Sequence, residues 1–290
     1  MQRRRLGQFD VSMLGLGTAR LASLGSRTSR ADAGRLLDTA ADSGINLIDT
    51  ADTYGSTDCE RLLGELLKHR KSRFVVMTKG GLLHADLPGP MRALNQFAKK
   101  ARRLNGRRQN FRPDYINGAI EASLRRLQLD AIDIYLLHSV TAEASRDDEL
   151  AGILREAVAA GKIRSFGFSV DDSALYSAAA STQGCSIVQA MVNPVTARAH
   201  REHCPQLRLA NIGVIANQVL ASGLDSSHAP LARVDMVAAE RGIARSAVLL
   251  RFAAAQPAVA SVLIGTNDPF HLAANARAFD TDVAPEDGDW

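Results

Sequence analysis

The sequence predicts an α/β fold, a single (β/α)8 TIM barrel with an N-terminal β-hairpin, and three observations support this. The 290 residues are 46% hydrophobic, which is ordinary for a globular protein and sufficient for one large barrel or two modest domains. Apolar strand-like runs alternate with helix-like segments along the chain, which favours one barrel. The alternation gives eight strands with intervening helices, the number that closes into a barrel through right-handed crossovers. We therefore expect residues 1–290 to form one domain.

The predicted elements follow in a regular order. Runs at 3–6 and 11–13, separated by residues 7–10, predict a hairpin that caps the barrel floor. Gly44 would end the first helix as a C′ glycine, Thr57 and Glu60 have capping-box spacing at the second, and Pro113 suits the first position of the third. The strands are expected at 14–17, 45–49, 74–79, 132–138, 165–169, 187–189, 213–216 and 259–264, and the helices at 29–43, 57–69, 113–127, 144–160, 173–181, 199–210, 230–241, 246–255 and 269–278.

Charge and cysteine content limit the class of protein. The net charge is +4, with the basic excess at 3–5 and 92–112, and a basic loop is more often solvated or directed at a small anion than at nucleic acid. Cys59, Cys185 and Cys204 show no paired spacing, which favours free thiols in a reducing compartment. The chain shows no signal-peptide pattern and no apolar run of membrane-spanning length. We expect a cytoplasmic protein, monomeric or weakly homo-oligomeric, without nucleic-acid or membrane partners.

Two segments fall outside the strand–helix pattern. Residues 80–112 form a long connection with eight Lys or Arg residues from Arg92 onward, and it is expected over the active-site face, since loops of that length usually have a role. It would close over a cofactor pyrophosphate, receive an anionic substrate, or form a solvated amphipathic helix; the last ranks first by a small margin. The tail at 280–290 is expected to lie over one barrel face or to stay loose.

Polar residues stand where three consecutive strands end. Asp49 ends the second strand and Tyr54 follows it, Lys79 ends the third, and His138 ends the fourth. The C-terminal strand ends hold the chemistry of such barrels, so these side chains are expected to meet. Taken singly, Asp49 suits a turn, Tyr54 a loop aromatic, and His138 a hydrogen-bonded histidine beneath a loop. The set of four favours an active site.

The four side chains suit proton transfer to a carbonyl oxygen. The phenol of a tyrosine has a pKa of about 10, and the Lys79 ammonium is expected to lower the pKa of Tyr54. Asp49 is the expected counter-ion of a buried lysine. His138 would direct a ring nitrogen at the same substrate oxygen. None of the four can supply a hydride, so reduction would require a nicotinamide cofactor.

Candidate cofactor contacts lie in two loops. Gly265, Thr266 and Asn267 lead into the N-terminus of the last helix, where free N–H groups and the helix dipole favour phosphate groups. Gly17 and Thr18 follow the first strand and are further candidates. Their surroundings lack the G-x-G-x-x-G spacing, so a Rossmann site is not predicted.

Four stretches resemble the aldo-keto reductase family: GINLIDTADTYG at 44–55, TKGG at 78–81, DIYLLH at 133–138 and GKIRSFGFS at 161–169. The likeness covers nearly the whole chain, and the first stretch is highly specific. The resemblance implies a (β/α)8 NAD(P)H-dependent oxidoreductase that reduces an aldehyde or ketone, or oxidises a sugar-like alcohol. It implies Tyr54 as general acid/base, Lys79 and Asp49 as residues that tune it, and His138 as the residue that orients the carbonyl.

The resemblance also implies cofactor contacts. Ser169 and Gln189 match positions that hold the nicotinamide carboxamide, and Asn275 matches an adenine contact. Asn217 stands where relatives place an aromatic residue under the nicotinamide ring, and His271 stands where an Arg commonly grips the 2′-phosphate. The family implies NADP, and the loss of that Arg makes NAD an alternative.

The sequence permits two other interpretations. His200, His203 and Cys204 lie close together, but one helical turn cannot place all three on a metal and no fourth ligand is evident, so no metal site is predicted. The missing aromatic at Asn217 motivates an alternative function, a non-catalytic nucleotide-binding barrel that acts as a redox sensor or partner-docking subunit. The four strand-end residues argue against it.

Overall fold

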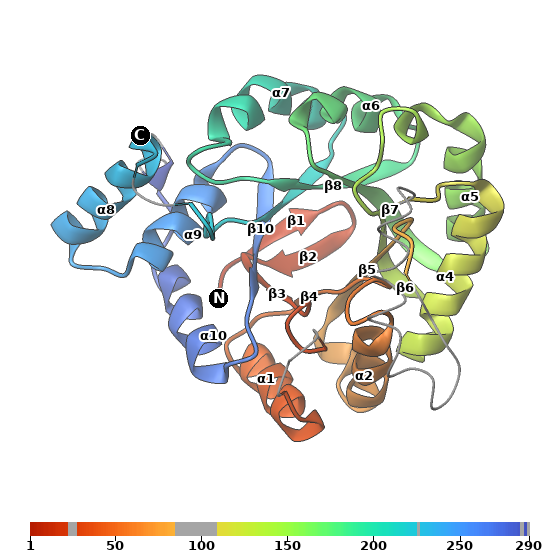
Figure 1. The fold of residues 1–290 in the computed structure, drawn as a ribbon, viewed down its shortest axis with the longest axis horizontal. Coiled ribbons are helices and arrows are strands. Elements are labelled where there is room, and N and C mark those ends of the chain that lie inside the picture. The colour runs from red at the N-terminus through yellow and green to blue at the C-terminus, as the bar shows by residue number, and fades with distance from the viewer. Residues whose placement is uncertain (23–27, 85–108, 225–226, 285–286, 289–290) are drawn as a thin grey trace.

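The computed structural model describes residues 1–22, 28–84, 109–224, 227–284 and 287–288, and it shows the predicted (β/α)8 barrel (Figure 1). Eight parallel strands close in the order β10-β3-β4-β5-β6-β7-β8-β9, and helices surround them. A separate two-stranded antiparallel hairpin precedes the barrel. The basic segment 92–108, and with it the choice among the three roles of the long loop, lies outside the described residues.

The strands and helices lie close to the predicted positions. The hairpin strands are β1 (Arg3–Leu6) and β2 (Phe9–Ser12), and the barrel strands are β3 (Leu14–Gly17), β4 (Leu47–Asp49), β5 (Val75–Gly80), β6 (Ile132–Leu137), β7 (Ile163–Val170), β8 (Cys185–Met191), β9 (Gly213–Asn217) and β10 (Val259–Gly265). The helices are α1 (Arg30–Asp42), α2 (Asp58–Leu67), α4 (Pro113–Leu127), α5 (Asp148–Ala159), α6 (Tyr176–Ser181), α7 (Ala197–Leu209), α8 (Ala229–Arg241), α9 (Arg245–Ala255) and α10 (Pro269–Ala276). In the described ranges, none of these helices has both the length and the hydropathy to cross a membrane.

The hairpin covers the N-terminal end of the barrel, as predicted. Leu6 pairs directly with Phe9, so the turn is Gly7-Gln8, shorter than the four residues predicted. Gly7 has a φ of 56°, which glycine adopts without steric strain. Leu6 is fully buried against apolar side chains that point into the barrel from its strands.

The helix termini follow the predicted caps only in part. Gly44 follows α1 with a φ of 79°, as predicted. The N-terminus of α1 has a capping box that was not predicted, in which the Ser29 hydroxyl accepts from the Asp32 N–H (3.1 Å) and the Asp32 carboxylate accepts from the Ser29 N–H (3.2 Å). The capping box predicted at α2 is wrong. Thr57 has a φ of 79° and its side chain makes no cap hydrogen bond, and the Glu60 side chain is fully buried.

Two predicted helices begin later than expected because a 3-10 turn precedes each of them. The Asp147 carboxylate accepts from the Leu150 N–H (3.1 Å), so α5 starts after the turn at Ala144–Arg146. A similar 3-10 turn, Ser173–Leu175, precedes α6.

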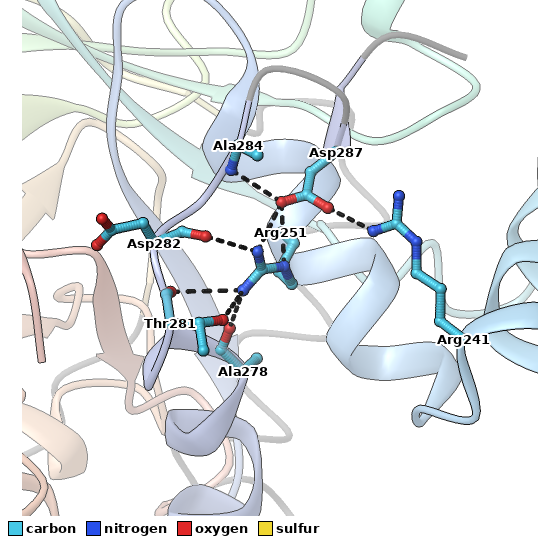
Figure 2. A network of polar contacts seen from close by, with 7 residues as sticks. All are labelled: Arg241, Arg251, Ala278, Thr281, Asp282, Ala284 and Asp287. Carbon is cyan, nitrogen blue, oxygen red and sulfur yellow. Dashed lines mark hydrogen bonds and ion pairs between the residues drawn. The ribbon is translucent and has the colours of Figure 1, made fainter.

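The described part of the C-terminal tail is bound to the outer helices α8 and α9 (Figure 2). Arg251 on α9 donates to the backbone oxygens of Ala278 (3.0 Å) and Asp282 (2.7 Å) and to the Asp287 carboxylate (2.8 Å). Asp287 also accepts a hydrogen bond of 2.6 Å from Arg241 on α8. Because the Asp287 side chain is only 4% exposed, this double ion pair fixes its segment of the tail.

Candidate functional site

Three adjacent strands bring the four predicted residues to one end of the barrel. Asp49 is the last residue of β4, Lys79 lies near the end of β5, and His138 directly follows β6. Strands β4, β5 and β6 are parallel neighbours, so their C-terminal ends lie together. The His138 N–H donates to the Gly80 oxygen (2.8 Å), which fixes the turn after β6. Tyr54 lies in the turn between β4 and α2.

The Lys79 ammonium group is the centre of the cluster. Its Nζ donates to Asp49 Oδ1 (2.5 Å), to the Thr50 backbone oxygen (2.9 Å) and to Tyr54 Oη (3.1 Å). The lysine side chain is only 1% exposed. All three of its N–H bonds are therefore used, which holds the ammonium in one position.

Tyr54 and His138 lie next to each other beside this ammonium. Their rings meet edge to face, with centroids 6.1 Å apart and an interplanar angle of 83°. Lys79 Nζ also lies 4.8 Å from the centroid of the Tyr54 ring. A phenol, an imidazole, an ammonium and a carboxylate thus occupy one small region.

The protonation states follow from burial and charge. Burial raises the pKa of Tyr54, and although the Lys79 ammonium opposes this, the net direction is upward. This is opposite to the lowered pKa expected from the sequence, because the cost of burying a phenolate outweighs the attraction of one ammonium. Burial by itself lowers the pKa of Lys79. Asp49 and Tyr54 raise that pKa by more than burial lowers it, so the net pKa lies above the ordinary value. At neutral pH the pair is a neutral phenol hydrogen-bonded to an ammonium.

A second chain of hydrogen bonds reaches the cluster from β7 and β8. The Ser169 hydroxyl donates to Gln189 Oε1 (3.1 Å), and Gln189 Nε2 donates to Asp49 Oδ1 (3.2 Å). Asp49 therefore accepts on the same oxygen from Gln189 and from Lys79. The structure joins two of the predicted carboxamide-binding residues to the proton-transfer residues, which the sequence did not indicate.

Two of the predicted cofactor contacts carry buried acceptors. Among the described residues, Asn217 Oδ1 and Asn275 Oδ1 are buried without a hydrogen-bond partner. Asn275 uses its Nδ2 to donate to the His271 oxygen (2.7 Å), which orients the amide. A buried acceptor without a partner costs free energy, so each oxygen suits a ligand donor such as an amide or an adenine amino group.

The N-terminus of α10 is already capped. The Asp268 carboxylate accepts from the N–H groups of Phe270 (2.8 Å) and His271 (3.4 Å), and Thr266 Oγ1 accepts from the Asp268 N–H (3.0 Å). Asn267 donates to Thr28 (3.1 Å). Asp268 accepts hydrogen bonds from N–H groups that were predicted to bind phosphate, and its carboxylate adds a negative charge. This helix end therefore attracts an anion less than predicted.

Gly17 and Thr18 support the backbone at the end of β3. A Cβ at Gly17 would lie 3.3 Å from the Ile264 oxygen, so glycine allows β3 to approach β10. The Thr18 hydroxyl donates to the backbone oxygen of Asp49 (2.9 Å), and the Thr18 side chain is fully buried. In this structure both residues hold Asp49 in place from behind.

A buried ion pair beneath the cluster was missed from the sequence. Glu60 accepts from Arg126 Nε (2.6 Å) and from the Thr78 hydroxyl (2.6 Å), and Arg126 also donates to Ser123 (3.1 Å). It ties α2 and α4 to β5 directly before Lys79. The available signal was a carboxylate on the apolar face of α2, three residues before the buried Leu63.

Comparisons with known proteins agree with this fold. The family model described as Aldo/keto reductase family matches residues 13–288. The chain is 28% identical to pyridoxal 4-dehydrogenase of Microbacterium luteolum over 98% of this chain and 95% of that protein. It is 37% identical to 6-dehydroglucose reductase of Novosphingobium aromaticivorans, over 57% of this chain and 50% of that protein.

Solved structures show the same architecture. The aldo-keto reductase AKR11C1 from Bacillus halodurans superposes with a TM-score of 0.81 at 23% identity, covering 99% of this chain and 94% of that chain. An aldo/keto reductase from Klebsiella pneumoniae, solved in complex with NADP and acetate, gives a TM-score of 0.74 at 25% identity and covers 99% and 92% of the two chains. With the family model spanning nearly the whole barrel, the chain belongs to the aldo/keto reductase family of oxidoreductases.

Proposed function

We propose that this oxidoreductase uses NADP(H) to reduce an aldehyde or ketone to an alcohol, or to oxidise a sugar-like alcohol in reverse. One observation carries the proposal: a buried Lys79 ammonium contacts both the Tyr54 hydroxyl and the Asp49 carboxylate at the barrel mouth. A scaffold protein has no evident use for this arrangement, because a buried charged cluster costs desolvation free energy.

The reaction needs a proton at the carbonyl oxygen as that oxygen becomes an alkoxide. Tyr54 keeps its proton at neutral pH, because its pKa is raised by burial, and it is the acid that donates. The phenolate left behind lies 3.1 Å from the Lys79 ammonium, which stabilises the new charge. Asp49 holds Lys79 in place. His138, beside the phenol ring, orients the carbonyl oxygen towards Tyr54.

The residues present fit a nicotinamide cofactor. Ser169 and Gln189 would hold the carboxamide, Asn217 would lie beside the nicotinamide ring, and Asn275 would receive the adenine amino group on its Oδ1. Bound NADPH supplies the hydride. The relative solved with NADP supports the choice of NADP. His271, in place of an arginine that would contact the 2′-phosphate, keeps NAD as an alternative cofactor.

The test is reduction of 4-nitrobenzaldehyde by NADPH and by NADH, followed by absorbance of the reduced nicotinamide. The wild-type protein is expected to turn over. Tyr54→Phe is expected to lose activity by about 10²-fold or more, since it lacks the acid. Tyr176→Phe is the matched control, because it removes a hydroxyl that bonds His200 on the outer helices.

Nucleotide binding must be measured beside activity. Saturable NADPH binding with no turnover of any carbonyl tested would favour the non-catalytic nucleotide-binding barrel. Equal activity of Tyr54→Phe and wild type would show that the proton comes from another group.

A further inference from the structure

The N-terminal end of the barrel holds a hollow of about 540 Å³ beside the hairpin turn. It is formed by Gly7 and Gln8, by the last turns of α5 and by the first residues of β7 and β8. Its volume lies within the range of small-molecule sites, about 300–1,000 Å³. Because Ser169 and Gln189 lie near the C-terminal ends of β7 (Ile163–Val170) and β8 (Cys185–Met191), the beginnings of these strands lie on the opposite face from the proposed catalytic residues.

The surface of this hollow is largely apolar. Phe166 lies at its base, and Val158, which is 37% exposed, lies on the α5 side. Gly184 keeps the space open, since a Cβ there would lie 3.1 Å from the Phe166 ring. The exposed valine is the kind of surface that an apolar ligand would remove from water, whereas the Phe166 ring, only 1% exposed, adds little to it.

The charges around the hollow have one sign. Among its described lining residues, the only charged side chains are Arg155 and Arg164. Arg164 is paired with the largely buried Asp133 (3.2 Å), whereas among the residues that the structure describes Arg155 donates only to the Gln183 backbone oxygen, at a long 3.5 Å. Arg155 therefore has most of its guanidinium donors available to an anion.

The neighbouring surface adds further positive charge. A second hollow, of about 610 Å³, shares Arg164 and is lined by Lys68, His69 and Lys71, with Asp133 as its acidic residue. The hollow itself is held in shape by polar contacts. Gln8 Nε2 donates to the Arg164 oxygen (2.7 Å), and the hydroxyls of Ser165 and Ser186 lie 2.5 Å apart across β7 and β8.

We infer that this hollow is a binding site for an organic anion with an apolar body, such as an aryl carboxylate or aryl sulfonate. The apolar body packs on Phe166 and Val158, and the acid group faces Arg155, with Arg164 beside it. The site is separate from the catalytic end, and the inference does not depend on the proposed reaction.

The test compares two fluorescent probes with the same aromatic body. Anilinonaphthalene sulfonate carries the acid group, and N-phenylnaphthylamine is neutral. Wild-type protein is expected to bind both saturably and the sulfonate more tightly. Arg155→Glu should weaken the sulfonate about tenfold or more, through loss of a charge-assisted contact, and leave the neutral probe unchanged. Ala159→Trp, which fills the hollow from the exposed face of α5, should weaken both probes.

Two matched variants control for surface effects. Arg198→Glu reverses an exposed charge on α7, and Ala160→Trp adds the same ring one residue beyond the lining; neither should change binding. Circular dichroism is the check that each variant is folded. The inference is overturned by absence of sulfonate binding, by equal binding in Ala159→Trp and wild type, or by equal loss of both probes in Arg155→Glu.

Discussion

Lys79 Nζ lies 3.1 Å from Tyr54 Oη and, on its other side, 2.5 Å from Asp49 Oδ1. One ammonium therefore joins a phenol in a loop to a carboxylate on the neighbouring strand. The contact does not make Tyr54 more acidic than an ordinary tyrosine, because burial raises its pKa. The contact instead places a positive charge where the phenolate appears during proton transfer.

Lys79→Met should reduce turnover by about 10²-fold or more while nucleotide binding changes little, because the methionine cannot stabilise the phenolate. Steady-state kinetics and a fluorescence titration with NADPH measure the two effects. The substitution leaves Asp49 buried without its cation, so the folded fraction is checked by thermal melting. Lys79→Met/Asp49→Asn, which removes that charge, should stay inactive although better folded; restored turnover would rule out the assigned role of Lys79.

The pH dependence of carbonyl reduction should reflect the raised pKa of Tyr54. Reduction needs the protonated phenol, so the rate is lost only as the pH rises through this raised pKa, above the ordinary value of about 10. We expect no loss from deprotonation of this group between about pH 6 and pH 9. The measurement is kcat against pH under saturating substrate and cofactor. A decline centred near neutral pH that persists in His138→Gln would mean that Tyr54 is more acidic than its burial implies.

Gly80→Ala should destabilise the protein by about 2 kcal/mol through overpacking. A Cβ at Gly80 would lie 2.0 Å from the hydroxyl of Tyr135, which is fully buried and has no hydrogen-bond partner among the described residues. Tyr135→Phe alone should be close to neutral, and Gly80→Ala/Tyr135→Phe should recover part of the loss. Urea unfolding of the four proteins measures this, and equal losses from Gly80→Ala in both backgrounds would show that the hydroxyl is not the obstacle.

Asp287→Asn should lower the free energy of unfolding by about 2 kcal/mol at pH 7, since it leaves Arg251 without its carboxylate. Burial by itself raises the pKa of Asp287. Hydrogen bonds from Arg251 and Arg241 lower that pKa by more than burial raises it, so the folded-state pKa lies below the ordinary value. The stabilisation is therefore present above about pH 4 and is lost as the pH falls through the folded-state pKa. Denaturant unfolding at pH 7 and at acid pH tests this; a difference between variant and wild type that does not shrink in acid would contradict it.

His271→Arg should raise the preference for NADPH over NADH about tenfold, through a charge-assisted contact with the 2′-phosphate. The His271 side chain is 74% exposed and lies 3.5 Å from Asp268, so an arginine has room there. Fluorescence titration with both nucleotides gives the ratio of Kd values, with His203→Arg as a control on α7. An unchanged ratio would mean that position 271 does not face the adenosine phosphate.

Local sequence patterns determined much of the fold. The Gly44 terminus of α1 and the start of α4 at Pro113 were predicted because each depends on residues only a few positions apart. The placement of Asp49, Lys79 and His138 at strand ends is local in the same sense, and parallel pairing then brings them together.

Contacts between distant segments were decided only by the tertiary structure. Gln189 reaches Asp49 across 140 positions, and Glu60 leaves its predicted cap to pair with the buried Arg126. The raised pKa of Tyr54 was likewise decided by the tertiary structure. Burial and distance set the free energy of a charge, and both are properties of the packed barrel, whereas the sequence specifies which groups are present and on which strand they stand.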